Sequence, residues 1–250
     1  MPARYEVIAV EGLPEIRRGD DLARLMVEAA RRQDTPIRDR DLLVVSQKIV
    51  SKTEGRLVRL SEVTPSTRAL TVAEEIGRDP RLVEVILSES RRVVRQDKGV
   101  LIVETHHGWI CANAGVDQSN VDADTACLLP EDSDRSAAQL RERLRELTGH
   151  DLAIVVADTF GRPWREGLVN VAVGLAGFQP IVSYLGKEDP AGHVLQATIL
   201  ALADELASAA EPVMGKLDRI PVVIIRGLDW ERGEGSSRAL MRDPARDLFR

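Results

Sequence analysis

The chain has 250 residues and a formal net charge of −6, with 34 Lys and Arg against 40 Asp and Glu. This balance argues against a dedicated nucleic-acid coat or a polybasic membrane binder. Hydrophobic residues make up 44% of the chain and charged residues 30%, which is typical of globular domains rather than disordered or fibrous chains. Aromatic residues make up only 3%, which argues further against a surface that stacks nucleic-acid bases.

Two sequence features indicate the compartment. The cysteines, Cys111 and Cys127, form no CxxC pair, and a chain of this size needs no disulfide framework. No apolar run reaches the length of about eighteen residues that spans a membrane, and no basic-then-apolar export signal opens the chain. We therefore expect a cytoplasmic protein with no membrane partner.

The first part of the chain predicts strands and helices in alternation, from apolar runs with period 2 or 3.6 and from the turn residues between them. The expected elements are a strand at 5–10, a helix at 22–30 capped by Asp20 and Asp21, a strand at 41–46, and helices at 72–76 and 82–88 separated by Pro80.

The rest of the chain also predicts both strands and helices. We expect a meander of strands at 93–95, 99–103 and 108–111 with a turn at Asp97-Lys98-Gly99, a helix at 131–149, a strand at 151–157, a small apolar segment at 169–176, an Ala-rich helix at 193–211, a strand at 221–226 and a charged tail at 228–250. Adjacent strands occur beside helix-separated ones, so the pattern predicts an α+β fold with mixed or antiparallel sheets and packed helices. We treat residues 1–250 as one catalytic unit, with division into two intimately packed subdomains left open.

Two aspartates are candidate metal ligands. Asp158 follows the most apolar strand, where an ionised carboxylate is costly unless it is paired or coordinated. Asp117 lies in a segment of small residues and carboxamides at 111–120, and Thr159 adds a further oxygen. Mg²⁺ and Mn²⁺ prefer oxygen donors and bridge carboxylates to phosphates. The alternatives are an Asx-rich turn around Asp117 and a capping role for Asp158.

Basic side chains near these aspartates suit phosphate groups. Lys48 and Lys52 lie among hydroxyl and amide side chains, and Arg162 and Arg165 follow Asp158 closely. The chain has neither a P-loop motif nor a Gly-rich dinucleotide motif that follows a strand, so a nucleotide site would be of another type. A structural Arg–Asp pair is the alternative for the arginines.

Four segments together resemble the coenzyme F420-0:gamma-glutamyl ligase family: Val10–Pro14, Ser46–Lys52, Ile110–Asn120 and Asp158–Arg165. The shorter matches Leu128–Pro130, Ala203–Leu206, Met214–Lys216 and Pro221–Gly227 extend the resemblance over nearly the full chain. The pairing of ANAGVDQSN with DTFGRPWR is its most specific part.

The resemblance implies a GTP-dependent ligase that joins L-glutamate through a gamma-linkage to the coenzyme F420 precursor. The precursor carboxylate would become an acyl phosphate, and GDP and phosphate would leave. Its implied site residues are Asp117, Asp158 and Lys52 for catalysis; Leu13, Pro14, Glu15, Ile16, Gln47, Lys48, Lys52, Asn120, Gly215 and Lys216 for nucleotide; and Asp117, Asp158 and Thr159 for metal. The implied cations are two Mg²⁺ or Mn²⁺ ions, together with potassium.

The resemblance also implies a homodimer of the stand-alone form, without the carboxyl-terminal flavin-binding domain that some members carry. The Ala-rich helix at 193–211 and the small residues at 169–177 suit either a close dimer interface or an ordinary core. Two other functions stay open: an amide ligase for a different carboxylic acid, and a nucleotide- or deazaflavin-binding protein without turnover.

Overall fold

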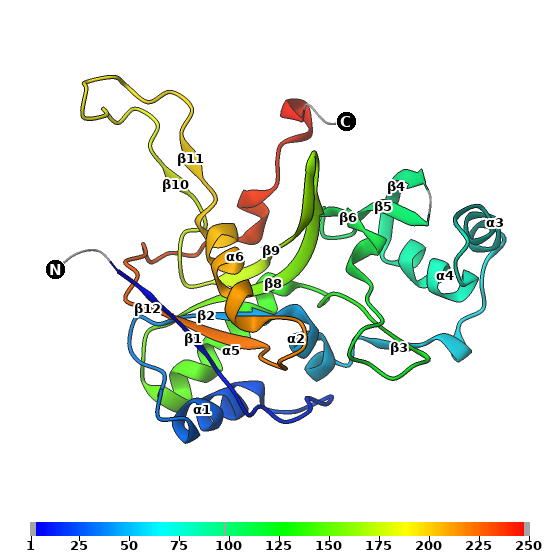
Figure 1. Cartoon of the computed structure of the whole chain (residues 1–250), viewed down its shortest axis with the longest axis horizontal. Helices are drawn as coiled ribbons and strands as arrows, with labels where there is room; N and C mark the ends of the chain where they lie inside the picture. Colours follow the sequence, from blue (N-terminus) through cyan, green and yellow to red (C-terminus); the bar gives the residue numbers. More distant parts are fainter. Residues whose placement is uncertain (1–3, 98, 248–250) are drawn as a thin grey trace.

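A computed structural model describes residues 4–97 and 99–247, and a five-stranded sheet lies at its centre (Figure 1). The strands run in the order β1 (Glu6–Ala9), β12 (Val222–Arg226), β2 (Leu42–Ser46), β8 (Ala153–Arg162) and β9 (Arg165–Ala176). Within this sheet β2 and β8 pair in parallel and the other neighbours pair antiparallel. The mixed sheet and its packed helices confirm the predicted α+β class.

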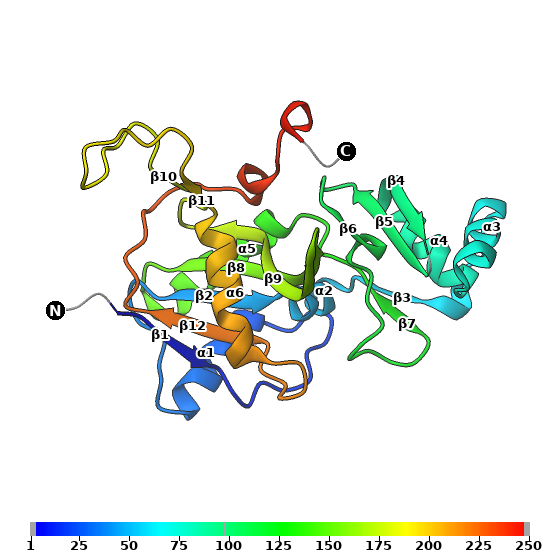
Figure 2. The ribbon, with the colours of Figure 1, turned by 45° about the horizontal axis from the view of Figure 1, so that its top comes forward.

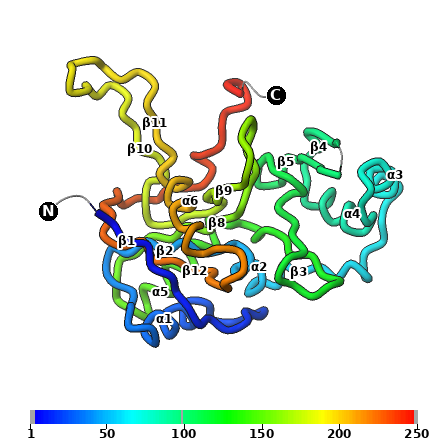
Figure 3. The backbone as a smooth tube through the Cα atoms, in the orientation of Figure 1, coloured from blue at the N-terminus to red at the C-terminus, as the bar shows by residue number. Residues whose placement is uncertain are grey.

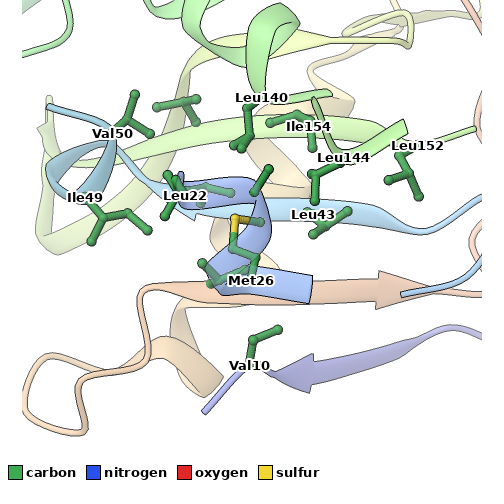
Figure 4. Close-up of a cluster of buried hydrophobic side chains, with 14 of the residues drawn as sticks. Val10, Leu22, Met26, Leu43, Ile49, Val50, Leu140, Leu144, Leu152 and Ile154 are labelled. Carbon is green, nitrogen blue, oxygen red and sulfur yellow. The ribbon is translucent and has the colours of Figure 1, made fainter. Parts of the chain in front are cut away.

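One face of the sheet is covered by α1 (Leu22–Arg32), α2 (Gln47–Glu54) and α5 (Ser133–Thr148). Asp21 caps α1 by accepting a hydrogen bond from the backbone of Arg24, as the sequence predicted. Met26 and Leu144 pack with Ile154 of β8 in a fully buried cluster (Figure 4). Helix α2 was missed because its apolar residues are few among polar ones.

The opposite face of the sheet is covered by α6 (Leu202–Met214) (Figure 2). Ala203, Ala207 and Ala210 of this helix are buried, as are residues 172–176 at the end of β9, so both segments contribute to the core of this chain. The helix predicted at 193–211 is wrong in its first part. Residues before 202 instead belong to a hairpin that contains β10 (Val182–Ser183) and β11 (Ile199–Leu200), which projects from the sheet (Figure 3).

The segment predicted as a charged tail is partly packed into the fold. Trp230 is buried, its indole NH donates to the backbone oxygen of Arg40, and the Arg40 guanidinium lies 3.8 Å from the centre of its ring. Phe178 contacts the same ring edge-on. Two short 3₁₀ turns follow at Ser237–Leu240 and Pro244–Arg246. Charge alone therefore misled the prediction for 228–250.

A third hydrophobic cluster, beside the two that flank the large sheet, holds the middle of the chain together (Figure 1). The predicted meander and paired helices are confirmed there, although Lys98 in its turn lies outside the described residues. The elements are β3 (Leu57–Arg59), a 3₁₀ turn (Leu60–Glu62), α3 (Thr67–Ile76), α4 (Pro80–Ser88), β4 (Ser90–Asp97), β5 (Val100–Thr105), β6 (Ile110–Ala112), a 3₁₀ turn (Asn113–Gly115) and β7 (Thr125–Cys127). Among the described residues, no helix is long and apolar enough to cross a membrane.

Candidate functional site

The parallel pairing of β2 and β8 brings two predicted site segments together. Ser46 at the end of β2 pairs with Ala157 of β8, so Lys48 and Asp158 both lie just beyond this pair. The prediction that the strand ends at Ala157 is wrong, because β8 continues through Arg162 in a hairpin with β9. The register shift beside Val156 and Ala157 leaves one extra residue, Val173, on β9, so the side chains of β8 keep their alternation up to Asp158.

Lys48 joins α2 to the loop that carries Asp117. Its ammonium donates to Oδ2 of Asp117 at 2.6 Å and to the backbone oxygen and hydroxyl of Ser119 at 2.9 and 2.7 Å. The backbone NH and hydroxyl of Ser119 also donate to the Asp117 carboxylate. Burial opposes ionisation of Asp117, but the hydrogen bonds and charge of Lys48 and the hydrogen bonds of Ser119 together outweigh this effect, so the pKa of Asp117 is lowered. Asp117 is therefore a fixed, ionised carboxylate.

Asp158 has the opposite electrostatic character. Burial raises its pKa from 3.8 to about 6; the backbone NH of Thr159 lowers the pKa and the negative charge of Asp117 raises it further. Lys48 and Lys216 are near enough to lower this pKa, yet no ion pair to Asp158 forms within the described part of the chain. The two predicted aspartates thus lie within electrostatic reach of each other, one compensated and the other lacking a paired cation.

Thr159 belongs to a second polar group on the α6 side. Its hydroxyl donates to Oδ1 of Asn170, its register partner on β9, at 2.7 Å. The Lys216 ammonium donates to the same Thr159 hydroxyl at 2.8 Å and pairs with the carboxylate of Glu211 at 2.7 Å. The structure therefore brings Lys216, from the loop after α6, onto a predicted metal ligand.

Lys52 lies one helical turn after Lys48 on α2. Its side chain is mostly buried and its ammonium pairs with the exposed carboxylate of Glu15. This pair ties the loop after β1 to α2. The pKa of the nearby Cys127 thiol, which burial raises to about 11, is influenced by Lys48, Asp117 and Lys52 together. The predicted lysines and Asp117 thus all lie within electrostatic reach of one buried thiol.

Other predicted nucleotide-site residues take different positions. Ile16 is buried and Leu13 packs against the α1 side of the core, so their side chains help to fix the loop, whereas Pro14 is exposed. The Gln47 amide is buried and accepts a hydrogen bond from Ser51. Two further residues of the predicted set are Asn120, which is exposed in a turn with φ of 55°, and Gly215, which ends α6 with φ of 57°.

Comparison with known proteins assigns the chain to a family. A model of the F420-0:Gamma-glutamyl ligase family matches residues 12–227. The chain belongs to this family. It is 47% identical to the coenzyme F420:L-glutamate ligase of Methanopyrus kandleri, over 99% of this chain and 97% of the relative. The proteins of the same name from Methanothermobacter thermautotrophicus and Methanocaldococcus jannaschii are 46% and 39% identical, over 98% and 99% of this chain and 98% and 97% of theirs.

The matched segment of this F420-0:gamma-glutamyl ligase family member contains residues that sequence reasoning missed. Asn170 is a buried carboxamide that holds Thr159, and Glu211 holds Lys216. The signal for Asn170 was a lone carboxamide in an otherwise apolar strand. Asn113 has positive φ and a buried amide oxygen that, within the described residues, has no hydrogen-bond partner. It lies four residues before Asp117 in the ANAGVD motif.

The oxygen donors at this site fit a hard divalent cation. Asp158 is a partly buried carboxylate that, in the described part of the chain, lacks a paired cation, and Asp117 offers a second carboxylate nearby. Carboxylate oxygens suit Mg²⁺ and Mn²⁺. The described residues contain no group of three or more acidic, His or Cys ligands, so such an ion would complete its coordination with phosphate and water oxygens.

Proposed function

We propose that this protein is a GTP-dependent ligase that adds L-glutamate through a gamma-linkage to the coenzyme F420 precursor. The relatives are named as coenzyme F420:L-glutamate ligases, and the chain matches them over nearly its full length. One structural observation carries the chemistry: Asp117, Asp158 and the three lysines Lys48, Lys52 and Lys216 gather from four separate parts of the chain.

The difficulty of the reaction is electrostatic. A carboxylate of the precursor must approach the γ-phosphate of a highly negative nucleotide, and cations that neutralise the phosphates lower this barrier. The ammonium groups of Lys48, Lys52 and Lys216 supply three such charges. Mg²⁺ or Mn²⁺ bound by Asp117 and Asp158 would add Lewis-acid stabilisation of phosphate oxygens.

The proposed steps balance without a protein nucleophile. The precursor carboxylate attacks the γ-phosphorus, the bond to the β-phosphate oxygen breaks, and GDP leaves. The amine of L-glutamate then attacks the acyl carbon, loses a proton and expels phosphate. The thiols of Cys111 and Cys127 do not take part, because burial raises their pKa values to about 12 and about 11 and keeps them protonated. Positioning and charge do the catalytic work.

A direct test combines the protein with GTP, Mn²⁺, L-glutamate and the coenzyme precursor, and follows the product by mass spectrometry. We expect the precursor mass to rise by whole glutamyl units while GDP accumulates. Asp158→Asn keeps the shape of the side chain and removes its charge, so we expect turnover to cease with the fold intact. Asp189→Asn, on the exposed hairpin that contains β10 and β11, is the matched control. An active Asp158→Asn enzyme would remove Asp158 from the metal site.

The same assay separates the alternatives. A binding protein without turnover would bind GTP but release no GDP. A ligase for another acid would release GDP only when that acid replaces the precursor, so competition among acceptor acids identifies the substrate. Dimerisation is part of the proposal, and sedimentation of the native protein at micromolar concentration tests it.

A further inference from the structure

The tip of the hairpin between β8 and β9 holds side chains that the proposed reaction steps do not use. Beyond its pairing with β2, β8 pairs only with β9, and residues 158–171 form a two-stranded ribbon that extends past the end of β2. The ribbon ends in a loop of Pro163 and Trp164, which lies between Arg162 and its register partner Arg165. The sequence indicated that these arginines suit an anion, with a structural Arg–Asp pair as the alternative.

Both arginines belong to the face of the ribbon that holds Asp158. Side chains at alternate positions of a strand share a face, so Asp158, Phe160 and Arg162 lie on one side. The register shift before Arg162 places its extra residues, 166–167, on β9, so β8 keeps its alternation. Arg165 shares the face as the partner of Arg162. Arg162 follows Asp158 by four residues, which is about 13 Å along a strand.

The two guanidinium groups form a positive pair at the tip. Arg162 donates to the backbone oxygen of Gly167 at 3.0 Å. Neither Arg162 nor Arg165 forms an ion pair with a carboxylate within residues 4–97 and 99–247, so the Arg–Asp pair considered as the alternative does not form there. Like charges that face each other across two strands repel. An anion bound between them would relieve that repulsion and accept charge-assisted hydrogen bonds.

Trp164 lies between the two arginines in the chain and presents its indole to solvent. It is 74% exposed, whereas Trp230 is buried and Trp109 packs against the α1 side of the core. Its φ of 59° lies in the left-handed region, which glycine adopts readily and a bulky residue rarely does. Neither burial nor backbone conformation therefore favours a tryptophan here, and such outliers indicate function. An exposed indole offers a flat face on which a planar ring can stack.

We propose that the hairpin tip is the subsite for the acceptor of the ligation, with Trp164 stacked on its planar ring and Arg162 and Arg165 on its linker phosphate. This inference rests on the proposed function, whose acceptor joins a deazaflavin ring to its carboxylate through a linker that contains a phosphodiester. The linker has about ten bonds and spans about 12 Å when extended, at the reach per bond of an extended peptide. A carboxylate placed beside Asp158 would therefore bring its ring to the hairpin tip, on the same face.

The test compares two variants of Trp164. Trp164→Gly removes the indole and suits the positive φ, whereas Trp164→Phe keeps an aromatic face. The full-length proteins are titrated with the coenzyme precursor in the presence of Mn²⁺ and GDP, which cannot activate the carboxylate, and the anisotropy of the ring fluorescence reports binding. We expect Trp164→Gly to bind the precursor about tenfold more weakly and Trp164→Phe to stay within about threefold of the wild type. Urea unfolding should show that Trp164→Gly is no less stable than the wild type, because the backbone strain is relieved.

Further measurements separate the acceptor subsite from other roles. Arg165→Gln should bind the precursor about fivefold more weakly, since a charge-assisted contact to phosphate is lost. Tyr5→Ala, which removes another exposed aromatic ring, should bind it like the wild type. In turnover assays, Trp164→Gly should raise the KM for the precursor and leave the KM for GTP within about twofold.

Three outcomes would contradict the proposal. Equal precursor affinity in Trp164→Gly and the wild type would refute the subsite and leave the proposed function standing. Sedimentation in which Trp164→Gly alone dissociates to a monomer would also refute it, because the tip would then belong to a contact between two copies of the chain. A wild type that does not bind the precursor would instead refute the proposed function, and the subsite with it.

Discussion

Ionised Asp158 should lower the free energy of unfolding of the protein. Burial, assisted by the charge of Asp117, raises the pKa of its carboxyl from 3.8 to about 6. At pH 7, ionised Asp158 therefore costs the folded chain about 3 kcal/mol relative to the unfolded chain. Asp158→Asn removes this charge and keeps the side-chain shape. In metal-free buffer, we expect the variant to be more stable than the wild type by up to about 3 kcal/mol.

The stability that Asp158→Asn gains over the wild type should increase with pH. Because the folded pKa lies above the unfolded one, the wild type loses stability as pH rises from about 4 to 6, and the loss is constant above that range. The difference between variant and wild type should thus fall to about 1 kcal/mol at pH 4.5 and almost vanish at pH 3. Mn²⁺ with GTP should narrow the difference at pH 7, because the ion would compensate the carboxylate.

Urea unfolding with EDTA present, at pH 7 and 4.5, measures both differences. Asp41→Asn is the control of opposite sign. Asp41 is buried and accepts two hydrogen bonds from the guanidinium of Arg226, so removing its charge should destabilise the fold by about 3–5 kcal/mol. If Asp158→Asn were no more stable than the wild type at pH 7, the electrostatic account of Asp158 would be refuted.

Two substitutions and one chemical modification test the packing. Gly174→Ala would place a methyl group 2.4 Å from the backbone of Ser133, and denaturant unfolding should show a loss of about 1–3 kcal/mol or more; an unchanged midpoint would contradict this close contact. Leu144→Ala, at a fully buried position, should cost about 2–5 kcal/mol in the same assay, and a loss below about 1 kcal/mol would argue against its packing. Cys111 and Cys127 should resist iodoacetamide at pH 8 until the protein is unfolded, because burial raises both pKa values; rapid alkylation of the native protein, read by mass spectrometry, would show otherwise.

The sequence predicted the buried elements well. The apolar runs at 42–45, 153–157 and 222–225, which lie within β2, β8 and β12, have no polar interruption, and α1 and α5 begin beside capping aspartates and show regular apolar spacing. These signals are local, so a single sequence contains them. Their pairing order is not local, because β12 lies between β1 and β2 only through contacts made across the chain.

The errors have physical reasons too. Ala and Leu occur both in α6 and in the preceding hairpin, so composition alone does not mark where the helix begins at Leu202. Asp158 and Thr159 interrupt an apolar run, but backbone pairing with β9 carries the strand past them. The site was predicted residue by residue through motifs. The role of Asn170 in holding Thr159, by contrast, depends on strand register, which no spacing rule supplies.

The burial of Trp230 bears on how fragments of this protein should be made. The family match ends at residue 227, which suggests a convenient place to stop an expression product. A product that stopped there would lack the indole that packs on Phe178 and Arg40, and would leave that flank of the α6 layer open to water. Loss of a buried tryptophan of this kind costs about 3–5 kcal/mol, enough to remove much of the stability of an average domain. The folding unit therefore extends past the segment that the family model matches.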